Sequence, residues 1–323
     1  MSRSLTARAI LFACALIFAG HAASQEDAPK QFVVGGGTPF GYYFGLAGAV
    51  CAALNGRNDP KFRCLNVANG DSSTNLREVD EGLIDFAFVQ SDWLYRASRG
   101  KGRYRSTGPN SELRSILSVP AEMLTILAHP IAGAKAITQL AGRRIGYDAP
   151  NSYSYLLMRA AVEAARIDVL DFAPELEANA NITSQICRGR IDAMVTVERH
   201  PSASLAGLIG QCGLTLVSLD QLVINQALTE RPDLTPFRIK AGSYPGIETD
   251  IDTFGLMAVL VTQSSASIPL IEAVMKALFE TGSNEASPPL FKAPSSDEIK
   301  RTEDVAPLHS AAEAYFRQMG WTR

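Results

Sequence analysis

A glycine-rich turn, residues 35–41 (GGGTPFG), is the part of this sequence best suited to bind a ligand. It follows a predicted strand and precedes a predicted helix. Glycine lets the backbone adopt positive φ and approach a ligand closely. The unpaired N–H groups at a helix start favour a carboxylate or a phosphate. The turn therefore predicts an anion-binding site, and residues 69–73 and 148–154 repeat the arrangement later in the chain.

Enzyme chemistry finds little support in the sequence. Gly35 and Gly37 match the start of a dinucleotide fingerprint, but Gly41 comes one residue late and no acidic residue ends the second strand to bind a ribose. No Gly-x-Ser-x-Gly elbow or His-Glu-x-x-His helix occurs. The histidines beyond the N-terminal segment, His129, His200 and His309, lie in separate segments. We therefore expect no enzyme activity, no metal site and no cofactor.

The first 24 residues have the pattern of a signal peptide. Arg3 and Arg8 precede an apolar run, residues 9–19, and small residues follow at Ala22, Ala23 and Ser24. The run is shorter than the roughly 20 residues that a membrane-spanning helix needs, so a retained anchor is the less favoured alternative. We expect cleavage near Ser24, export to the periplasm and a soluble mature chain.

Charge and length limit the class of protein further. The chain has 30 basic and 33 acidic residues, a net charge of −3, and no basic run or Arg-rich helix that would bind nucleic acid. About 300 residues after cleavage exceed what one hydrophobic core usually organises. We expect two lobes and a monomer.

Four cysteines remain after the leader, in two close pairs: Cys51 with Cys64, and Cys187 with Cys212. Two disulfides fit an exported chain. This connectivity is one of three, and we favour it because each bridge then stays within one lobe. Metal binding is an alternative without a Cys-x-x-Cys motif or a nearby histidine to support it, and buried free thiols are another.

Strands and helices alternate along the chain, which predicts α/β lobes with largely parallel sheets. The predicted strands are 31–34, 63–68, 86–89, 113–119, 124–128, 145–147, 193–197, 214–218 and 254–262, and the predicted helices are 42–54, 74–81, 152–165, 181–188, 268–280 and 310–319. Strand 124–128 is expected to cross toward the second lobe. The pattern Gly-x-Ile-Asp precedes an apolar strand twice, at residues 82–85 and 189–192, and suggests a duplicated lobe architecture.

Taken in order, these segments resemble the TAXI family of solute-binding proteins, which serve tripartite ATP-independent periplasmic (TRAP) transporters. The resemblance spans nearly the whole mature chain. Its most specific parts are residues 88–93 (FVQSDW) and 306–309 (APLH), and residues 35–43, 69–75, 82–85, 140–145, 192–195 and 241–246 add to it, as do Cys51 and Cys64.

The resemblance implies a type II periplasmic binding protein fold, with a mixed sheet in each of two lobes and two crossing strands as hinge. It implies lobe I from residues 25–122 and 248–323, and lobe II from residues 123–247. The implied function is capture of a small organic anion, such as a dicarboxylate or glutamate, and delivery to a TRAP permease. An alternative is a sensing subunit that docks on a membrane histidine kinase.

Three segments depart from the family pattern. The second-lobe turn reads Pro-Asn-Ser-Tyr-Ser at residues 150–154, where the family has Pro-Gly-Ser-Gly, which narrows the expected pocket. Residues 69–72 place Asp71 where the family has glycine, although Asp71 can be satisfied as a helix cap. Residues 198–202 add Glu198 and Arg199. The ligand class within the organic anions therefore stays open.

Candidate ligand contacts come from both lobes. They are Gly37, Thr38, Tyr42, Tyr43, Asn69, Ser72, Ser73, Asn75, Gln90 and Ser91 in the first, and Asn151, Ser152, Tyr153, Ser154, Arg199 and Tyr244 in the second.

Several of these candidates have a structural alternative. Tyr42 and Tyr43 differ by about 100° around their helix, so at most one should face the ligand. The alternative for Gln90, Ser91 and the serines at 152 and 154 is helix capping. For Asn75 it is a solvated helix face, for Arg199 an ion pair with Glu198, and for Tyr244 packing at the hinge.

Overall fold

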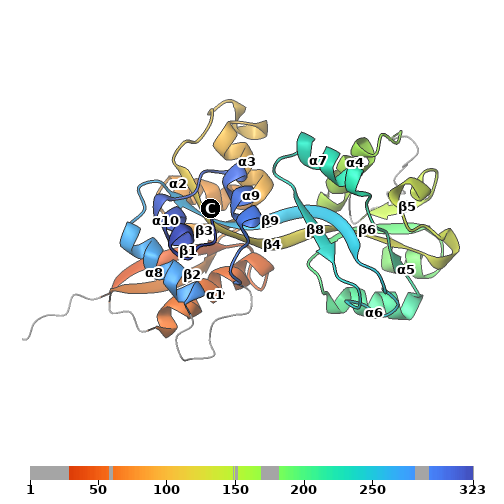
Figure 1. Cartoon of the computed structure of the whole chain (residues 1–323), viewed down its shortest axis with the longest axis horizontal. Helices are drawn as coiled ribbons and strands as arrows, with labels where there is room; N and C mark the ends of the chain where they lie inside the picture. The colour runs from red at the N-terminus through yellow and green to blue at the C-terminus, as the bar shows by residue number, and fades with distance from the viewer. Residues whose placement is uncertain are drawn as a thin grey trace, which may run out of the picture.

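The computed structural model describes residues 29–57, 61–147, 149, 152–168, 182–280 and 291–322. The predicted signal peptide, residues 1–24, and the candidate Asn151 lie outside these residues. The described chain forms two lobes joined by two long strands (Figure 1). This is the two-lobed α/β architecture that the sequence predicts.

The first lobe starts with three strands, each followed by a helix. They are β1 (Lys30–Gly36), α1 (Tyr42–Gly56), β2 (Phe62–Ala68), α2 (Ser72–Asp80), β3 (Phe86–Gln90) and α3 (Ser91–Arg99), with a 3₁₀ turn, η1 (Gly102–Arg105), after them. β1 pairs in parallel with both β2 and β3. The carboxyl ends of all three strands therefore lie at one edge of the sheet, where their following helices begin.

The second lobe repeats this alternation with more irregular elements. These are η2 (Pro130–Ala132), η3 (Ile137–Leu140), β5 (Ile145–Tyr147), α4 (Tyr153–Ala164), α5 (Ile182–Cys187), β6 (Ala193–Glu198), α6 (Ala203–Cys212), β7 (Thr215–Leu216), α7 (Gln221–Glu230) and β8 (Thr235–Ile239). The predicted strand 214–218 is mostly wrong, because only Thr215 and Leu216 pair with a neighbouring strand as β7. Helices α6 and α7 and strand β8 were not predicted.

Two long strands connect the lobes, β4 (Leu113–Ala128) and β9 (Ile251–Gln263). The sequence predicts two strands where β4 is one; the register shifts between Pro120 and Glu122, since proline cannot donate to the ladder. The sheet is continuous, in the order β2-β1-β3-β9-β4-β6-β5. β4 and β9 pair antiparallel with each other, with β6 and with β3. The sheet is therefore mixed and not largely parallel.

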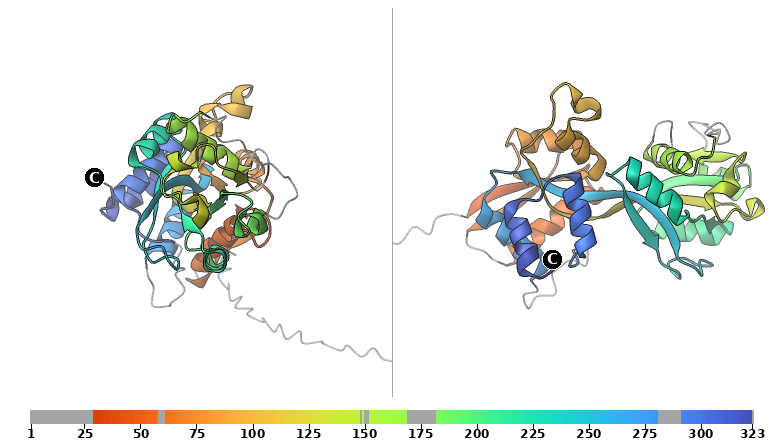
Figure 2. Two further views of the ribbon diagram at one scale, coloured as in Figure 1. Left: turned by 90° about the vertical axis from the view of Figure 1, so that its right-hand side faces the viewer. Right: turned by 45° about the horizontal axis from the view of Figure 1, so that its top comes forward.

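The chain returns to the first lobe after β9. Helices α8 (Ile268–Phe279), α9 (Ser296–Val305) and α10 (Ser310–Gln318) lie beside the N-terminal elements (Figure 2, right). Because β4 and β9 run through both lobes, the lobe limits at 122/123 and 247/248 remain a proposal.

Helices cover both faces of the sheet in each lobe. In the first lobe, one buried cluster joins β1 and β3 to α1, α8 and α10 around Phe32 and Phe86, and another places α2 and α3 on the opposite face. In the second lobe, α4 and α7 cover one face and α5 and α6 the other. Each lobe thus has its own core, which allows the lobes to move as separate bodies.

The repeated Gly-x-Ile-Asp pattern marks equivalent positions in the two lobes. The Asp85 carboxylate accepts a hydrogen bond of 2.8 Å from the Val33 amide, and that of Asp192 accepts one of 2.9 Å from the Arg144 amide. Two residues beyond each amide a strand glycine follows, and a Cβ on it would lie 2.7 Å from the isoleucine of the pattern. The same three-part contact therefore starts the sheet in both lobes.

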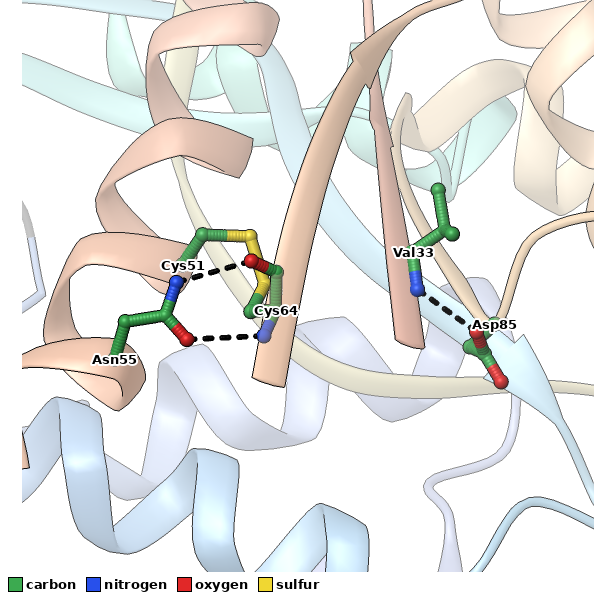
Figure 3. Close-up of a disulfide and its surroundings, with 5 residues drawn as sticks. All are labelled: Val33, Cys51, Asn55, Cys64 and Asp85. Atoms are coloured by element: carbon green, nitrogen blue, oxygen red, sulfur yellow. Dashed lines mark hydrogen bonds between the residues drawn. A yellow bond between two sulfur atoms is a disulfide. The ribbon is translucent and has the colours of Figure 1, made fainter. Parts of the chain in front are cut away.

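The predicted disulfides Cys51–Cys64 and Cys187–Cys212 are both present. Asn55 sits next to the first of them (Figure 3), and its side chain donates to the carbonyl and accepts from the amide of Cys64, each at 2.9 Å. β2 is an edge strand. Asn55 thereby pairs backbone groups that no neighbouring strand can reach.

Asn55→Ala should destabilise the protein while leaving the disulfide in place. The change leaves the N–H and C=O of Cys64 without partners, a loss of about 1–3 kcal/mol in the free energy of unfolding. Urea denaturation measures it. Asn225→Ala, on the exposed face of α7, is the control and should stay within about 0.5 kcal/mol of wild type. Equal stability of the two variants would contradict the role of Asn55.

Candidate functional site

The glycine turn before α1 has a backbone conformation different from the expected one. Among residues 35–41 the positive φ belongs to Phe40, at 63°, and to none of the glycines. A Cβ on Gly36 would lie 2.5 Å from the Cα of Phe44. The glycine at position 36 is therefore needed for close packing of β1 against the start of α1, and the expectation of positive φ at these glycines is wrong.

The start of α1 faces the hinge and the second lobe. Its N-cap, Gly41, has no capping side chain, so the first N–H groups have no side-chain acceptor. The Tyr42 hydroxyl donates to the Pro120 carbonyl at 3.1 Å. From the second lobe, the guanidinium carbon of Arg199 lies 4.1 Å from the centre of the Tyr42 ring, a cation–π contact.

The neighbouring helix α2 uses its own residues at its start. Asp71 caps it by accepting from the Thr74 amide and the Ser73 hydroxyl, both at 2.9 Å. The Thr74 amide is the main reason that the pKa of Asp71 is lowered. The prediction that Asp71 is satisfied as a cap is confirmed, and this N-terminus already holds a carboxylate.

Other candidates from the first lobe also have internal partners. Asn75 is buried and donates to the carbonyls of Gly36 and Phe88, each at 3.0 Å. The Asn69 side chain donates to Glu78, and the Ser72 hydroxyl accepts from the backbone amide of Gln90. Ser91 is buried and links the lobes, donating to the Asp233 carbonyl at 2.9 Å and accepting from the Met257 amide. Gly37 and Thr38 lie at the partly open turn. Ligand contact by any of these residues stays a prediction.

The start of α4 brings Tyr153 into contact with the first lobe. Ser152 is the N-cap, as the alternative role predicts, and its hydroxyl shares a hydrogen bond of 2.7 Å with that of Ser154. The Tyr153 hydroxyl accepts from the Trp93 indole N–H at 2.7 Å and donates to Asp92 at 3.3 Å. Burial raises the pKa of Tyr153, and the nearby Asp92 raises it further.

Tyr244 has a structural role in the second lobe. It is buried, and its hydroxyl accepts from the Ser202 amide at 2.8 Å and pairs with Nδ1 of His200 at 2.6 Å. Nε2 of His200 lies 2.8 Å from the hydroxyl of Thr125 on β4. Burial lowers the pKa of His200 to about 4, so the ring is neutral at pH 7.

A carboxylate that the sequence analysis missed lies where the lobes meet. Glu122, on β4, accepts from the Tyr43 hydroxyl at 3.1 Å and from the side-chain Nε2 of Gln90 at 2.7 Å. Burial raises the pKa of Glu122, and the nearby charge of Asp92 raises it further. The hydrogen bonds from Gln90 and Tyr43 act in the opposite direction and lower it. We call Tyr43, Gln90, Asp92, Glu122 and Tyr153 the interlobe cluster. Glu122 is the only acidic residue within β4, a signal that could have revealed it.

Asp92 is the second buried acid of this cluster. It is 1% exposed, and Arg96 lies 3.2 Å away, one helical turn along α3. Burial is the main reason that its pKa is raised, against the opposing charge of Arg96. The sequence contains one sign that Asp92 belongs to the site. It comes directly after a buried strand, at the sheet edge where ligands bind in α/β folds.

A separate cavity of about 640 Å³ lies within the first lobe, between α2, α3 and the segment after η1. Arg77, Asp80 and Arg103 are among its lining residues. All of its walls belong to that lobe, so closure of the two lobes would not enclose a ligand there. Among the described residues, no group of three His, Cys, Asp or Glu side chains could hold a metal ion.

The fold is that of a type II periplasmic binding protein. Residues 34–320 match the NMT1-like family, and the chain belongs to that family. A TctC solute-binding protein from Polaromonas is 11% identical, with a TM-score of 0.54 over 93% of this chain and 91% of that one. A putative periplasmic sulfonate-binding protein SsuA from Methylobacillus flagellatus KT is 12% identical, with a TM-score of 0.48 over 91% and 88%.

These relatives are binding proteins and not enzymes, in agreement with the prediction from sequence. Within the described part of the chain, every helix is too short or too polar to cross a bilayer.

The neutral state of His200 predicts a pH dependence of stability. The pKa of His200 is about 4 in the folded protein, against 6.5 ordinarily. Between these values the unfolded chain binds a proton that the folded protein does not, so this contribution is complete above pH 6.5 and is lost as pH falls toward 4. We expect a loss on the order of 1–3 kcal/mol.

Urea denaturation at pH 7 and pH 5 tests this. His200→Gln removes the titrating ring, so its stability should fall less than that of wild type over the same interval. Parallel loss of stability in the two proteins would contradict the assignment.

Proposed function

We propose that this protein is an extracytoplasmic solute-binding receptor of the TAXI type, exported by a cleaved signal peptide, that captures a small organic anion between its lobes and delivers it to a TRAP permease. The observation that carries the proposal is the meeting of side chains from both lobes at the starts of α1, α3 and α4. The Trp93 indole N–H of the first lobe donates a hydrogen bond to the Tyr153 hydroxyl of the second, and the Arg199 guanidinium of the second lobe stacks on the Tyr42 ring of the first.

The anionic end of the ligand is proposed to bind at the start of α1. This helix has fifteen residues and no capping side chain, so its first N–H groups and its dipole favour a negative charge. Arg199 is exposed and lies over Tyr42 in the first turn, where it can supply a positive charge from the opposite lobe. By contrast, the start of α2 already holds the carboxylate of Asp71.

Lobe closure would complete the site. With lobe I formed by residues 25–122 and 248–323 and lobe II by 123–247, the chain passes between the lobes within β4 and just before β9, and these are the places that need to bend. Excluding water strengthens the hydrogen bonds and charge interactions that the ligand makes. The ligand then stabilises a closed form that a permease can distinguish from the open one.

A ligand panel tests this function. Mature protein, residues 25–323, is heated with carboxylates, amino acids and sulfonates. A true ligand at 100 times its Kd should stabilise the fold by about 2.7 kcal/mol and raise the Tm by roughly 4 °C. Arg199→Ala should weaken that ligand by about tenfold or more. Arg317→Ala, which removes an exposed charge on α10, should leave binding unchanged.

The absence of any shift across the panel would refute capture of an organic anion. A shift that Arg199→Ala leaves intact would remove Arg199 from the site while keeping the function.

A further inference from the structure

The carboxylate of Glu122 is in an unusual position for a protein that binds only anions. It lies in the interlobe cluster, on a strand shared by both lobes. Each of its oxygens accepts one hydrogen bond, from Tyr43 and from Gln90. A carboxylate offers about four acceptor positions, so part of its capacity remains unused. Among the described residues, no lysine or arginine forms an ion pair with Glu122.

The donors of the cluster are already engaged. Tyr43 and Gln90, both predicted to bind a ligand carboxylate, donate to Glu122 instead. The Tyr153 hydroxyl donates to Asp92. A second carboxylate placed among these groups would displace existing bonds and meet two buried acids, and only Asp92 has a cation beside it. Like charges in a partly desolvated site repel strongly.

Burial raises the pKa of Asp92, but Arg96 and Arg231 both lower it, so Glu122 is the acid of the cluster that has no cation beside it in the described part of the chain. Further positive charge lies on the other side of the site. Arg199 and the uncapped start of α1 are on the Tyr42 side. Glu122 and Asp92 lie on the Tyr43 and Tyr153 side, and both acids influence the pKa of each of these tyrosines. The region between the lobes therefore has an electropositive end and an electronegative end. A molecule with opposite charges at its two ends is complementary to this arrangement.

We infer that the ligand is zwitterionic: its carboxylate binds at the start of α1 with Arg199, and its ammonium group donates to Glu122. This deepens the proposed function and depends on it. Glu122 is thus the residue that selects amino compounds over organic acids of the same carbon skeleton. Burial of an unpaired carboxylate is costly, and the ligand ammonium supplies the missing partner on closure.

Matched pairs of compounds test the inference. Calorimetric titration compares the standard amino acids that have a primary amine with their 2-oxo acids, for example L-glutamate with 2-oxoglutarate and L-alanine with pyruvate. Among the pairs that bind, the amino compound should bind wild type at least tenfold more tightly than its 2-oxo acid. Glu122→Gln should weaken the amino compound at least tenfold and bring the ratio of the two affinities close to one. Glu313→Gln, an exposed carboxylate on α10, is the matched control and should behave as wild type.

The outcomes separate the two proposals. Equal or tighter binding of the 2-oxo acids to wild type overturns the zwitterion and leaves the receptor function standing. Selection of amino compounds that Glu122→Gln does not alter overturns the role of Glu122. Failure of every compound in both series to bind overturns the zwitterion, and the wider panel of carboxylates and sulfonates then decides the receptor function. If Glu122→Gln does not fold, as circular dichroism will show, the wild-type ratio alone decides.

Discussion

The close antiparallel pairing of β4 and β9, where both strands pass between the lobes, is the constraint on which the rest of this structure depends. We call this place the crossing. The two strands pair along most of their length and belong to both lobes. At the crossing, a side chain on Gly255 would overlap the carbonyl oxygen of Glu122. Only glycine allows the strands to approach so closely. The crossing fixes the position of Glu122 between the lobes. It also joins the strands of the two lobes into one continuous sheet.

Everything proposed about ligand binding depends on what this crossing brings together. The helices that follow β1, β3 and β5 bring Tyr43, Asp92 and Tyr153 into one region, where Tyr43 donates to Glu122 and Tyr153 donates to Asp92. β6 pairs with β4 up to Glu198, and Arg199 follows directly. The TAXI pattern that the sequence resembles has glycines in the second turn of the first lobe and in the turn before α4. Here Asp71, Asn151 and Tyr153 stand at the glycine positions of that pattern, and Arg199 adds a charge.

Much of the fold could be predicted from sequence, because apolar periodicity and turn residues act locally. The Gly-x-Ile-Asp repeat was a true sign of equivalent lobes, and the cysteine spacing identified both disulfides. The site was less accessible. Asn75, one turn into its helix, and Ser91, at the end of a strand, are candidate ligand contacts from the sequence, which does not show that their hydrogen-bond partners come from distant segments. Glu122 lies between the two strands predicted at 113–119 and 124–128, and only the tertiary pairing of β4 with β9 and β6 reveals that it faces Tyr43 and Gln90.

The most direct test of this account is a crystal structure of the protein with the ligand that copurifies with it. The account predicts closed lobes and electron density for one small molecule between them, with a carboxylate at the start of α1 beside Arg199 and an amino group within hydrogen-bond distance of Glu122. A ligand bound instead in the cavity of the first lobe, between α2 and α3, would contradict it.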